Sequence, residues 1–385
     1  MKSLMQTLTR TALAAALGFG LTATALAADL KVGLSVSLSG PNSSLGVPYA
    51  KGMQAALAYR PEVNGRKIQL IVLDDGSDPT TAGRNARKLV EEDKVDVLMG
   101  TSGVPAAIAM AQVGRDAKVP MIGLTPIQLD PAENAWVFTV AQPTQLMIDA
   151  VVQRMKKDGV KTVGYIGFSD AWGDLVYNAL MKSAPEAGIQ VLGNERYARA
   201  DASVTGQVLK LVAMKPDAVM TGGAGTPGAL PFLALTERGF KGPVYGQHGL
   251  INPDFVRVVG ASGQNALMPT GPVIVAEQLP DGYPTKKIAM DFRAAFQKVN
   301  NAPTSDAFSA YSFDGWLVFT DAAARAKGEP GTPEFRLSLR DAIASTKEVV
   351  GTHGVYNFKP GNLYGVDERA RVIVKLDNGQ WKLAP

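Results

Sequence analysis

Short apolar runs alternate along the chain with amphipathic stretches of about a dozen residues. The apolar runs have the length of strands and are bounded by turn residues, and we expect strands at Lys31–Ser37, Lys67–Leu73, Val95–Gly100, Pro120–Leu124, Thr162–Gly167, Asp217–Thr221 and Pro243–Tyr245. The stretches between them have helical periodicity, and we expect helices at Ala50–Tyr59, Thr80–Glu92, Pro105–Asp116, Asp174–Ala187, Thr205–Met214 and Pro227–Arg238. Strands separated by helices of this length predict an α/β fold of parallel sheets with helices on both faces.

One part of this pattern occurs twice. A strand is followed by a loop, by a helix that opens at a proline, and by a second strand with a proline near its start. These prolines are Pro105 and Pro120 in the first copy, and Pro227 and Pro243 in the second. The chain of 385 residues also exceeds one typical domain. We therefore predict two Rossmann-like lobes, each with a parallel central sheet.

Ligands of open parallel sheets bind outside the carboxyl ends of the strands, so we expect those ends to face each other across a cleft. Corresponding loops should form opposite walls, namely Ser39–Gly46 and Phe168–Gly173, Thr101–Val104 and Gly222–Thr226, Thr125–Ile127 and Gln247–Gly249. Three crossovers should join the lobes, at Thr139–Thr144, Pro269–Val273 and near Gly351–Val355. With helical segments 285–300 and 307–326 returning to the first lobe, lobe 1 comprises 28–141 and 272–352, and lobe 2 comprises 142–271 and 353–385.

The N-terminus predicts export. Lys2 and Arg10 flank a charge-free run from Thr11 to Ala27, which ends in a small-x-small pattern at Ala25-Leu26-Ala27. This is typical of a cleaved signal peptide at residues 1–27, and the run is short for a membrane anchor. The chain contains no cysteine. Disulfides, thiolate metal sites and a lipidated cysteine are therefore excluded, and we expect a monomer that is free in the periplasm.

Charge and motifs argue against several other functions. Removal of the leader lowers the formal charge from +4 to +2, which is too small a charge to indicate nucleic-acid binding. Gly223-x-Gly225-x-x-Gly228 has the spacing of a dinucleotide fingerprint, but no carboxylate for a ribose follows before Asp254. A tight loop that admits a ligand or the opposite lobe is the favoured interpretation. We expect no cofactor.

Metal binding and catalysis are also disfavoured. Asp74, Asp75 and Asp78 provide too few regularly spaced oxygens for a hard cation, and Asp78 before Pro79 is typical of a helix N-cap. The sequence contains two histidines and no nucleophile elbow, so an α/β enzyme is the weaker hypothesis and we expect no catalytic residue. His353, in a glycine-bounded turn, is expected to be structural.

Several residues at the predicted cleft are suited to hold a ligand. Ser102, Gly103 and Val104 lie between a strand and a helix, where backbone N–H groups and the helix dipole favour an anion. An ordinary helix cap made by Ser102 is the alternative, and the cleft favours carboxylate binding. His248 should lie across from Thr125 and donate to a ligand oxygen, unless it is only a wall residue. Trp172 should stack on an apolar ligand body or cover the helix start.

The mature chain resembles the leucine/isoleucine/valine-binding protein family, the periplasmic receptors of branched-chain-type amino-acid ABC importers. The resemblance is carried in order by Ser39-Gly40-Pro41 with Gly46, Asp74-Asp75 through Asp78-Pro79, Gly100 through Val104, Val119-Pro120-Met121-Ile122, Ala171-Trp172-Gly173, Pro216-Asp217-Ala218-Val219, Gly225-Thr226-Pro227 and Gly239-Phe240-Lys241-Gly242. It implies hinge closure of two lobes on a ligand and docking onto an inner-membrane permease. A sensing module that docks on a signalling receptor has the same sequence features.

The resemblance also implies site residues, and the chain departs from the family at several of them. Ser102, Gly103 and Val104 match the carboxylate-binding loop, and Thr125, Pro126 and Ile127 match the second ligand-binding loop. Amino-acid-binding members carry a Thr at the position of Ile127, a Glu at that of His248, tyrosines near Leu45 and Ala224, and a Tyr at that of Trp172.

The substitution at His248 bears on the ligand. The family's Glu neutralises the ammonium of an amino acid, and an enclosed ammonium without a carboxylate partner is penalised by several kcal/mol. We therefore expect a carboxylate without an α-amine, with an apolar or aromatic body. A branched-chain amino-acid or amide receptor is the alternative.

Overall fold

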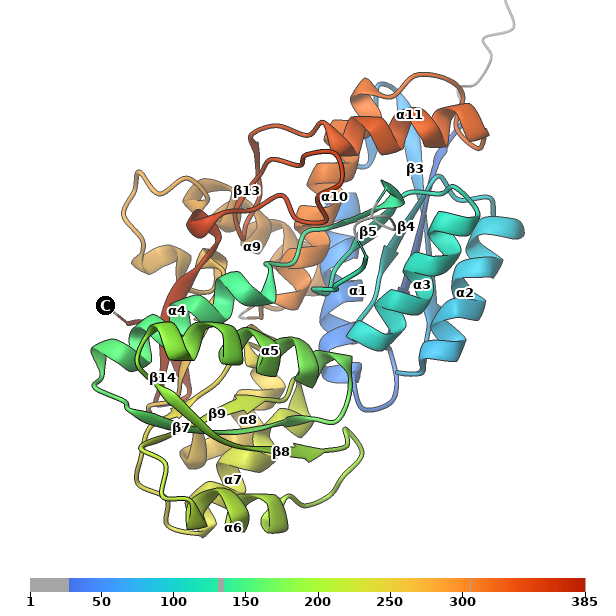
Figure 1. Ribbon diagram of the computed structural model, residues 1–385. Helices are drawn as coiled ribbons and strands as arrows, with labels where there is room; N and C mark the ends of the chain where they lie inside the picture. Colours follow the sequence, from blue (N-terminus) through green and yellow to red (C-terminus); the bar gives the residue numbers. More distant parts are fainter. Residues whose placement is uncertain (1–27, 131–134, 305, 385) are drawn as a thin grey trace, which may run out of the picture.

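The computed structural model describes residues 28–130, 135–304 and 306–384, so the expected signal peptide at 1–27 lies outside the described residues. The chain forms two lobes, and the upper one in Figure 1 combines segments from both ends of the sequence. The lower lobe contains the middle of the chain and the last strands.

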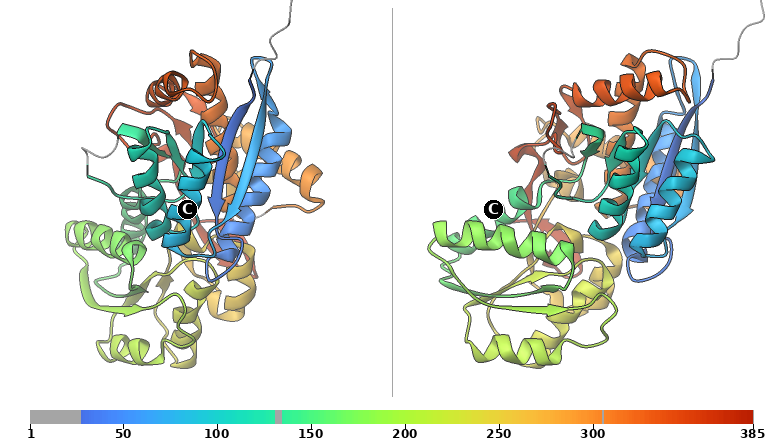
Figure 2. Two further views of the ribbon diagram at one scale, coloured as in Figure 1. Left: turned by 90° about the vertical axis from the view of Figure 1, so that its right-hand side faces the viewer. Right: turned by 45° about the vertical axis from the view of Figure 1, so that its right-hand side comes forward.

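Lobe 1 has a six-stranded sheet in the order β2-β3-β1-β4-β5-β6. Its strands are β1 Leu30–Val36, β2 Glu62–Val63, β3 Arg66–Asp74, β4 Val97–Gly100, β5 Met121–Gly123 and β6 Val137–Thr139. All neighbours pair in parallel except the β2–β3 hairpin at one edge. Helices cover both sides of this sheet (Figure 2), and they are α1 Ser43–Tyr59, α2 Pro79–Glu91, α3 Val104–Asp116, α9 Lys286–Asn300, α10 Phe308–Arg325 and α11 Pro333–Ala344.

Lobe 2 has a seven-stranded sheet in the order β15-β14-β11-β10-β9-β7-β8. Its strands are β7 Thr162–Phe168, β8 Gln190–Tyr197, β9 Ala218–Gly222, β10 Val244–Tyr245, β11 Leu267–Thr270, β14 Val372–Asp377 and β15 Gln380–Leu383. The pairs β11–β14 and β14–β15 are antiparallel, and the other pairs are parallel. Its helices are α4 Thr144–Lys157, α5 Ala171–Glu186, α6 Thr205–Ala213, α7 Leu230–Glu237 and α8 Pro253–Val259.

The predicted duplication is visible in the strand order. The run β8-β7-β9-β10-β11 of lobe 2 repeats β3-β1-β4-β5-β6 of lobe 1. Two lobes with parallel central sheets are therefore confirmed. The parallel strands have continuously apolar sequences because helices bury both faces of the sheet, as in β4, where all four residues are buried.

Several elements differ from the sequence-based expectation, and two of them bear on the cleft. Strand β8 was not predicted, because it is an edge strand whose residues are mostly half-exposed and lack a continuous apolar run. Helix α1 begins at Ser43 instead of Ala50 and continues through Pro48. The missing N–H of this proline removes one helical hydrogen bond without ending the helix, so the loop expected at Ser39–Gly46 is shorter than predicted.

Three chain crossings connect the lobes. The first runs from β6 to α4 and the second follows β11, as expected at Thr139–Thr144 and Pro269–Val273. The third was placed too early, near Gly351–Val355, where the chain forms the hairpin of β12 (Val349–Val350) and β13 (Val355–Tyr356). Tyr364 still forms a bridge with Thr139 of β6, so the chain leaves lobe 1 only after this residue and enters lobe 2 at β14.

A side-chain hydrogen bond stabilises the start of helix α2. Asp78 caps α2, as predicted, because its carboxylate accepts a hydrogen bond from the Thr81 N–H at 2.7 Å.

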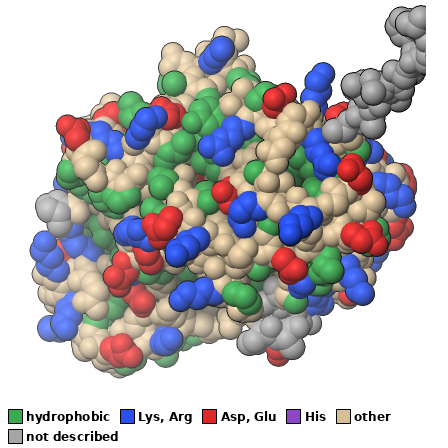
Figure 3. All heavy atoms as spheres, turned by 90° about the horizontal axis from the view of Figure 1, so that it is seen from above, with side chains coloured by type: hydrophobic (Ala, Val, Ile, Leu, Met, Phe, Trp, Pro, Cys, Tyr) green, Lys and Arg blue, Asp and Glu red, His purple; other side chains and the backbone are tan. Residues whose placement is uncertain are grey.

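Within residues 28–130, 135–304 and 306–384, no helix is long and apolar enough to cross a membrane. Basic and acidic side chains are interspersed on the face of lobe 1 shown in Figure 3.

Candidate functional site

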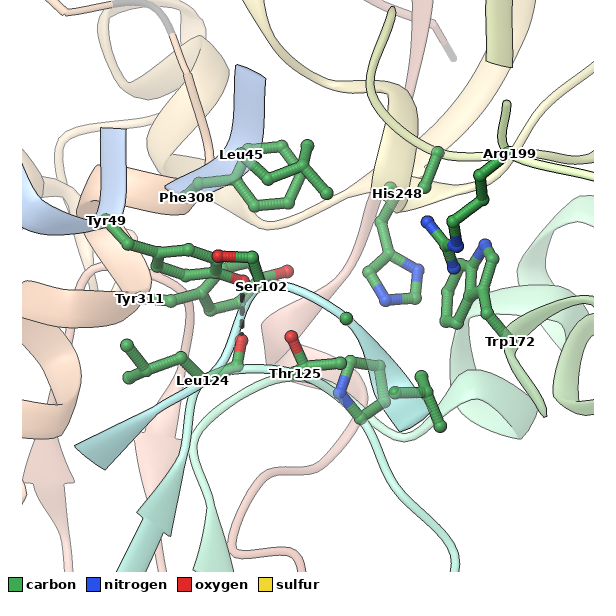
Figure 4. A pocket seen from close by; sticks show the side chains of 15 residues that line it. Leu45, Tyr49, Ser102, Leu124, Thr125, Trp172, Arg199, His248, Phe308 and Tyr311 are labelled. Atoms are coloured by element: carbon green, nitrogen blue, oxygen red, sulfur yellow. Dashed lines mark hydrogen bonds between the residues drawn. The ribbon is translucent and has the colours of Figure 1, made fainter. Parts of the chain in front are cut away.

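A pocket lies where the two lobes meet (Figure 4), and its empty space, part of which is open to solvent, amounts to about 360 Å³. The carboxyl ends of strands from both sheets lead into it, as the sequence predicted. Lobe 1 contributes Leu45, Tyr49, Ser102, Gly103, Val104, Leu124, Thr125, Pro126, Phe308 and Tyr311. Lobe 2 contributes Trp172, Arg199, Ala224, His248 and Gly249.

The fold brings nine of the ten expected site residues into this one pocket, and the exception is Ile127. Ile127 is fully buried in the hydrophobic core, and its carbonyl oxygen accepts a hydrogen bond from the Tyr364 hydroxyl at 2.6 Å. The expectation for Ile127 was therefore wrong, because the loop after β5 leaves the cleft directly after Pro126.

The lobes are closed on each other around the pocket. The Arg199 guanidinium of lobe 2 donates to the Asn42 side-chain oxygen of lobe 1 at 2.9 Å. The Thr226 N–H donates to the Ser44 hydroxyl oxygen at 3.2 Å. Because both hydrogen bonds cross from one lobe to the other, opening the cleft breaks them.

The wall loops do not all face their sequence equivalents. The loop after β9 was expected to face Thr101–Val104, but Gly225 and Thr226 lie against Ser44 at the start of α1. Helix α3, which follows the β4 loop, contacts α5 instead. The loop after β9 thus meets the element that follows β1, and the element that follows β4 meets the one that follows β7, so these loops are exchanged relative to the expectation. Thr125 and His248 do line the same pocket, as expected.

Gly225 explains the glycine-rich motif of lobe 2. Its φ is +58°, a conformation that L residues rarely adopt, and an added Cβ would lie 2.7 Å from the Ser44 hydroxyl oxygen and 3.3 Å from the Leu45 side chain. The glycine thus lets the opposite lobe approach closely, which is one of the two roles expected for this loop.

The β4–α3 junction provides polar groups on the lobe 1 side. Gly103 is the N-cap of α3 and makes no side-chain cap, so Ser102 does not cap the helix. Instead the Ser102 hydroxyl oxygen accepts from the Ser37 N–H at 2.9 Å, which leaves its proton available for an acceptor in the pocket. The first N–H groups of α3 have no partner within the helix. The Thr125 hydroxyl donates to the Thr101 carbonyl at 2.6 Å and so holds the two loops together.

His248 is the polar residue of the lobe 2 wall. Its ring is only 3% exposed, and neither ring nitrogen has a hydrogen-bond partner among the described residues. Burial lowers the pKa of His248 from its ordinary value to about 3, so the imidazole is neutral at pH 7. A neutral imidazole has one donor and one acceptor nitrogen, and both need a partner in a buried site. In Figure 4 the ring projects into the pocket between Thr125 and Trp172.

Trp172 and Arg199 are both held by Asp170. One carboxylate oxygen of Asp170 caps α5 by accepting from the N–H groups of Trp172 and Gly173. The other accepts from the Arg199 guanidinium at 2.6 Å. The Trp172 indole N–H donates to the Gly223 carbonyl at 3.2 Å, and its ring packs edge-on against His248, with the centroids 5.5 Å apart. The polar indole atom is therefore satisfied, and the apolar face of the ring lines the pocket.

The opposite end of the pocket is aromatic. Tyr49 and Phe308 pack edge to face with ring centroids 5.4 Å apart, and Leu45 and Tyr311 complete this end (Figure 4). The Tyr49 hydroxyl donates to the Leu124 carbonyl at 2.7 Å, so it is already satisfied within lobe 1. Deep burial accordingly raises the pKa of Tyr49 above its ordinary value.

Sequence reasoning missed several lining residues. Arg199 follows strand β8, and prediction of that strand would have placed Arg199 at a carboxyl end facing the cleft. Phe308 and Tyr311 lie one helical turn apart on α10, which was predicted as a helix of lobe 1 without a role in the site. Tyr49 was also missed, because it lies in the first turns of α1, before the residue at which the helix was expected to begin.

The remaining candidates have structural surroundings. His353 stacks on Tyr311 with ring centroids 3.9 Å apart and lies 2.9 Å through Nε2 from the Ala307 carbonyl, in keeping with the structural role expected. Asp74 and Asp75 accept hydrogen bonds from neighbouring serines and backbone groups. No cluster of acidic or histidine residues able to hold a metal ion is found in the described part of the chain.

Two lobes of one repeated α/β architecture, closed on each other over a pocket at their strand ends, define a solute-binding receptor. The chain belongs to the periplasmic binding protein family, whose model matches residues 29–361.

Solved structures support this assignment. An extracellular ligand-binding receptor from Rhodopseudomonas palustris is 40% identical, with a TM-score of 0.90 over 93% of this chain and 100% of that chain. A leucine-binding protein from Thermotoga maritima is 21% identical, with a TM-score of 0.79 over 92% of this chain and 98% of that chain. A solute-binding protein of an ABC transporter from R. palustris, solved with benzoate, is 21% identical, with a TM-score of 0.78 over 92% of this chain and 95% of that chain. The resemblance to the leucine/isoleucine/valine-binding family is thus confirmed, and the two structures at 21% identity share the fold.

Proposed function

We propose that this receptor binds a small carboxylate without an α-amine and with an apolar, preferably aromatic, body, and that it delivers this solute to an ABC importer in the inner membrane. The observation that carries the proposal is that the described pocket lining offers hydrogen-bond donors and no carboxylate. Among the described residues, the lining includes the Arg199 guanidinium and no acidic side chain. His248 adds two ring nitrogens that need partners.

Two carboxylates next to lining residues in the sequence or in space are already engaged. Asp170 binds Arg199 and caps α5. Asp306, next to the lining residue Phe308, accepts from the backbone N–H of Ser309 at 2.7 Å and from the hydroxyls of Ser309 and Thr304. The ammonium of an amino acid would therefore lose its hydration without gaining a carboxylate partner, which costs several kcal/mol.

A carboxylate ligand satisfies what the site leaves open. One carboxylate oxygen would accept from Ser102 and the first N–H groups of α3, where the helix dipole favours negative charge. His248 donates to a ligand oxygen through whichever ring nitrogen carries the proton. The aromatic end formed by Tyr49, Phe308 and Tyr311 would then enclose the apolar body. The benzoate complex of the R. palustris protein shows that the fold accommodates an aromatic acid, in that protein.

Titration calorimetry on the mature protein tests the ligand class with benzoate, 4-hydroxycinnamate, leucine and glutamate. We expect binding of the aromatic acids and weak or absent binding of the amino acids. Tight binding of leucine without binding of either aromatic acid would refute the proposal and would favour a branched-chain amino-acid receptor.

The remaining parts of the proposal concern context. We propose that the protein is exported by cleavage after Ala27, works in the periplasm as a monomer, presents its closed form to a permease and leaves its ligand chemically unchanged. Recovery of the bound solute unaltered after prolonged incubation, checked by mass spectrometry, tests the last point. A modified product would indicate an enzyme.

A further inference from the structure

A buried polar cluster lies where the chain crosses between the lobes. Gln142 belongs to the first crossing, directly before α4. Its side-chain N–H donates to the carbonyl of Ala370 at 2.9 Å, and Ala370 lies in the third crossing, directly before β14. Gln142 also contacts His353 and Tyr311. One side chain thus joins two of the three crossings.

The hydrogen bonds of this cluster form one consistent set. The Tyr311 hydroxyl donates to the Gln142 side-chain oxygen. His353 donates from Nε2 to the Ala307 carbonyl at 2.9 Å, so its Nδ1 accepts from the Gln142 amide at 3.3 Å. Because every polar side-chain atom has a partner, removal of one of them leaves a buried group unsatisfied.

The second crossing packs directly on the same cluster. A Cβ added at Gly271 would lie 1.8 Å from Nδ1 of His353 and 2.9 Å from the Gln142 amide nitrogen. The backbone of this crossing therefore approaches the cluster as closely as only glycine allows. All three crossings meet at Gln142 and His353.

Tyr311 connects this cluster to the pocket. Its ring lines the pocket on one side and stacks on the His353 imidazole at 3.9 Å with an interplanar angle of 12°. We propose that Tyr311 is a positioning residue that couples occupancy of the pocket to closure of the lobes. A ligand that fills the aromatic end holds the ring against His353 and keeps the hydroxyl on Gln142, which fixes the crossings in the closed arrangement. The ligand step of this inference rests on the proposed function.

Tyr49 provides a matched control. Both tyrosines are buried, line the pocket and donate one hydroxyl hydrogen bond, but Tyr49 donates to the Leu124 carbonyl and not to Gln142. Tyr311→Phe and Tyr49→Phe therefore remove the same chemical group from the same pocket. Gln142→Met removes the hydroxyl's acceptor at a residue that does not line the pocket.

Hydrogen–deuterium exchange of the mature protein, with and without benzoate, tests the coupling. In the ligand-free protein, Tyr311→Phe and Gln142→Met should speed amide exchange at residues 139–144, 268–273 and 366–372 together, because local opening of the three crossings becomes easier. Tyr49→Phe should affect only its own surroundings. The affinities for benzoate and 4-hydroxycinnamate should fall by the same factor of about ten in both crossing variants.

The outcomes separate the two proposals. Failure of benzoate and 4-hydroxycinnamate to bind the wild type contradicts the proposed ligand class, and the ligand-free exchange still decides the coupling. Faster exchange confined to the neighbourhood of residue 311, or the same effect at all three crossings in Tyr49→Phe, overturns the coupling. A loss of affinity in Tyr311→Phe that differs between the two ligands also overturns it, because a simple wall contact would act in that way.

Discussion

The replacement His248→Glu should invert the charge preference of the pocket. It removes a donor to the ligand carboxylate and places a second carboxylate beside it, in a site where the native side chain is only 3% exposed and solvent screening is weak. Two like charges about 4 Å apart repel by about 4 kcal/mol at an effective dielectric constant of about 20. The lost hydrogen bond to a charged group adds about 1.5–3 kcal/mol.

The introduced carboxyl group can relieve part of this repulsion by taking up a proton, since burial beside another carboxylate raises its pKa. We therefore expect a lower limit of about 3 kcal/mol, which corresponds to a loss of at least about a hundredfold in benzoate affinity. The same variant should gain affinity for leucine, because its ammonium acquires the carboxylate partner that the wild-type pocket lacks.

Titration calorimetry with benzoate and leucine measures both changes, and His248→Gln serves as the matched control. Glutamine still offers a donor and adds no charge, so its benzoate affinity should fall by less than about tenfold and leucine should gain nothing. Unchanged benzoate affinity in His248→Glu, or equal effects of Glu and Gln, would show that His248 does not face the ligand carboxylate.

Three further predictions concern pH, charge and closure. The pKa of His248 is about 3 in the folded protein against an ordinary value of 6.5, so the unfolded state binds the extra proton between these values. Relative to His248→Gln, the wild type should therefore lose about 4 kcal/mol of unfolding free energy between pH 7 and pH 3, as measured by urea denaturation; parallel pH profiles would contradict this. Arg199→Met should weaken benzoate binding at least about tenfold and should weaken binding of the neutral analogue benzamide less, because both ligands lose the closing hydrogen bond to Asn42 and only benzoate also loses a charge-assisted contact. Equal losses in calorimetry would assign Arg199 a purely structural role. Gly225→Ala should weaken ligand binding at least about tenfold, because the added Cβ meets the opposite lobe near Leu45. Small-angle scattering of the variant with ligand should then show a more open protein than the wild type, and a variant as compact as the wild type would refute the steric argument.

The sequence by itself determined the fold class and most of the site. The apolar runs of the central strands and the repeated helices that open at a proline are local features of the sequence. They could be predicted because a strand of a parallel sheet is buried on both faces and is therefore continuously apolar. The loops at Ser102, Thr125 and His248 could be placed at the cleft because residues that follow parallel strands share one edge of the sheet.

The tertiary structure decided which loops meet and which groups remain without partners. The exchange of facing loops, the exclusion of Ile127 and the late third crossing depend on how the lobes are rotated against each other, which no local pattern records. The charge of the pocket likewise depends on the ion pair between Asp170, which precedes α5, and Arg199, which follows β8. Hydrogen bonds between residues distant in sequence form only after folding, and for this reason their satisfaction can be read only from the folded chain.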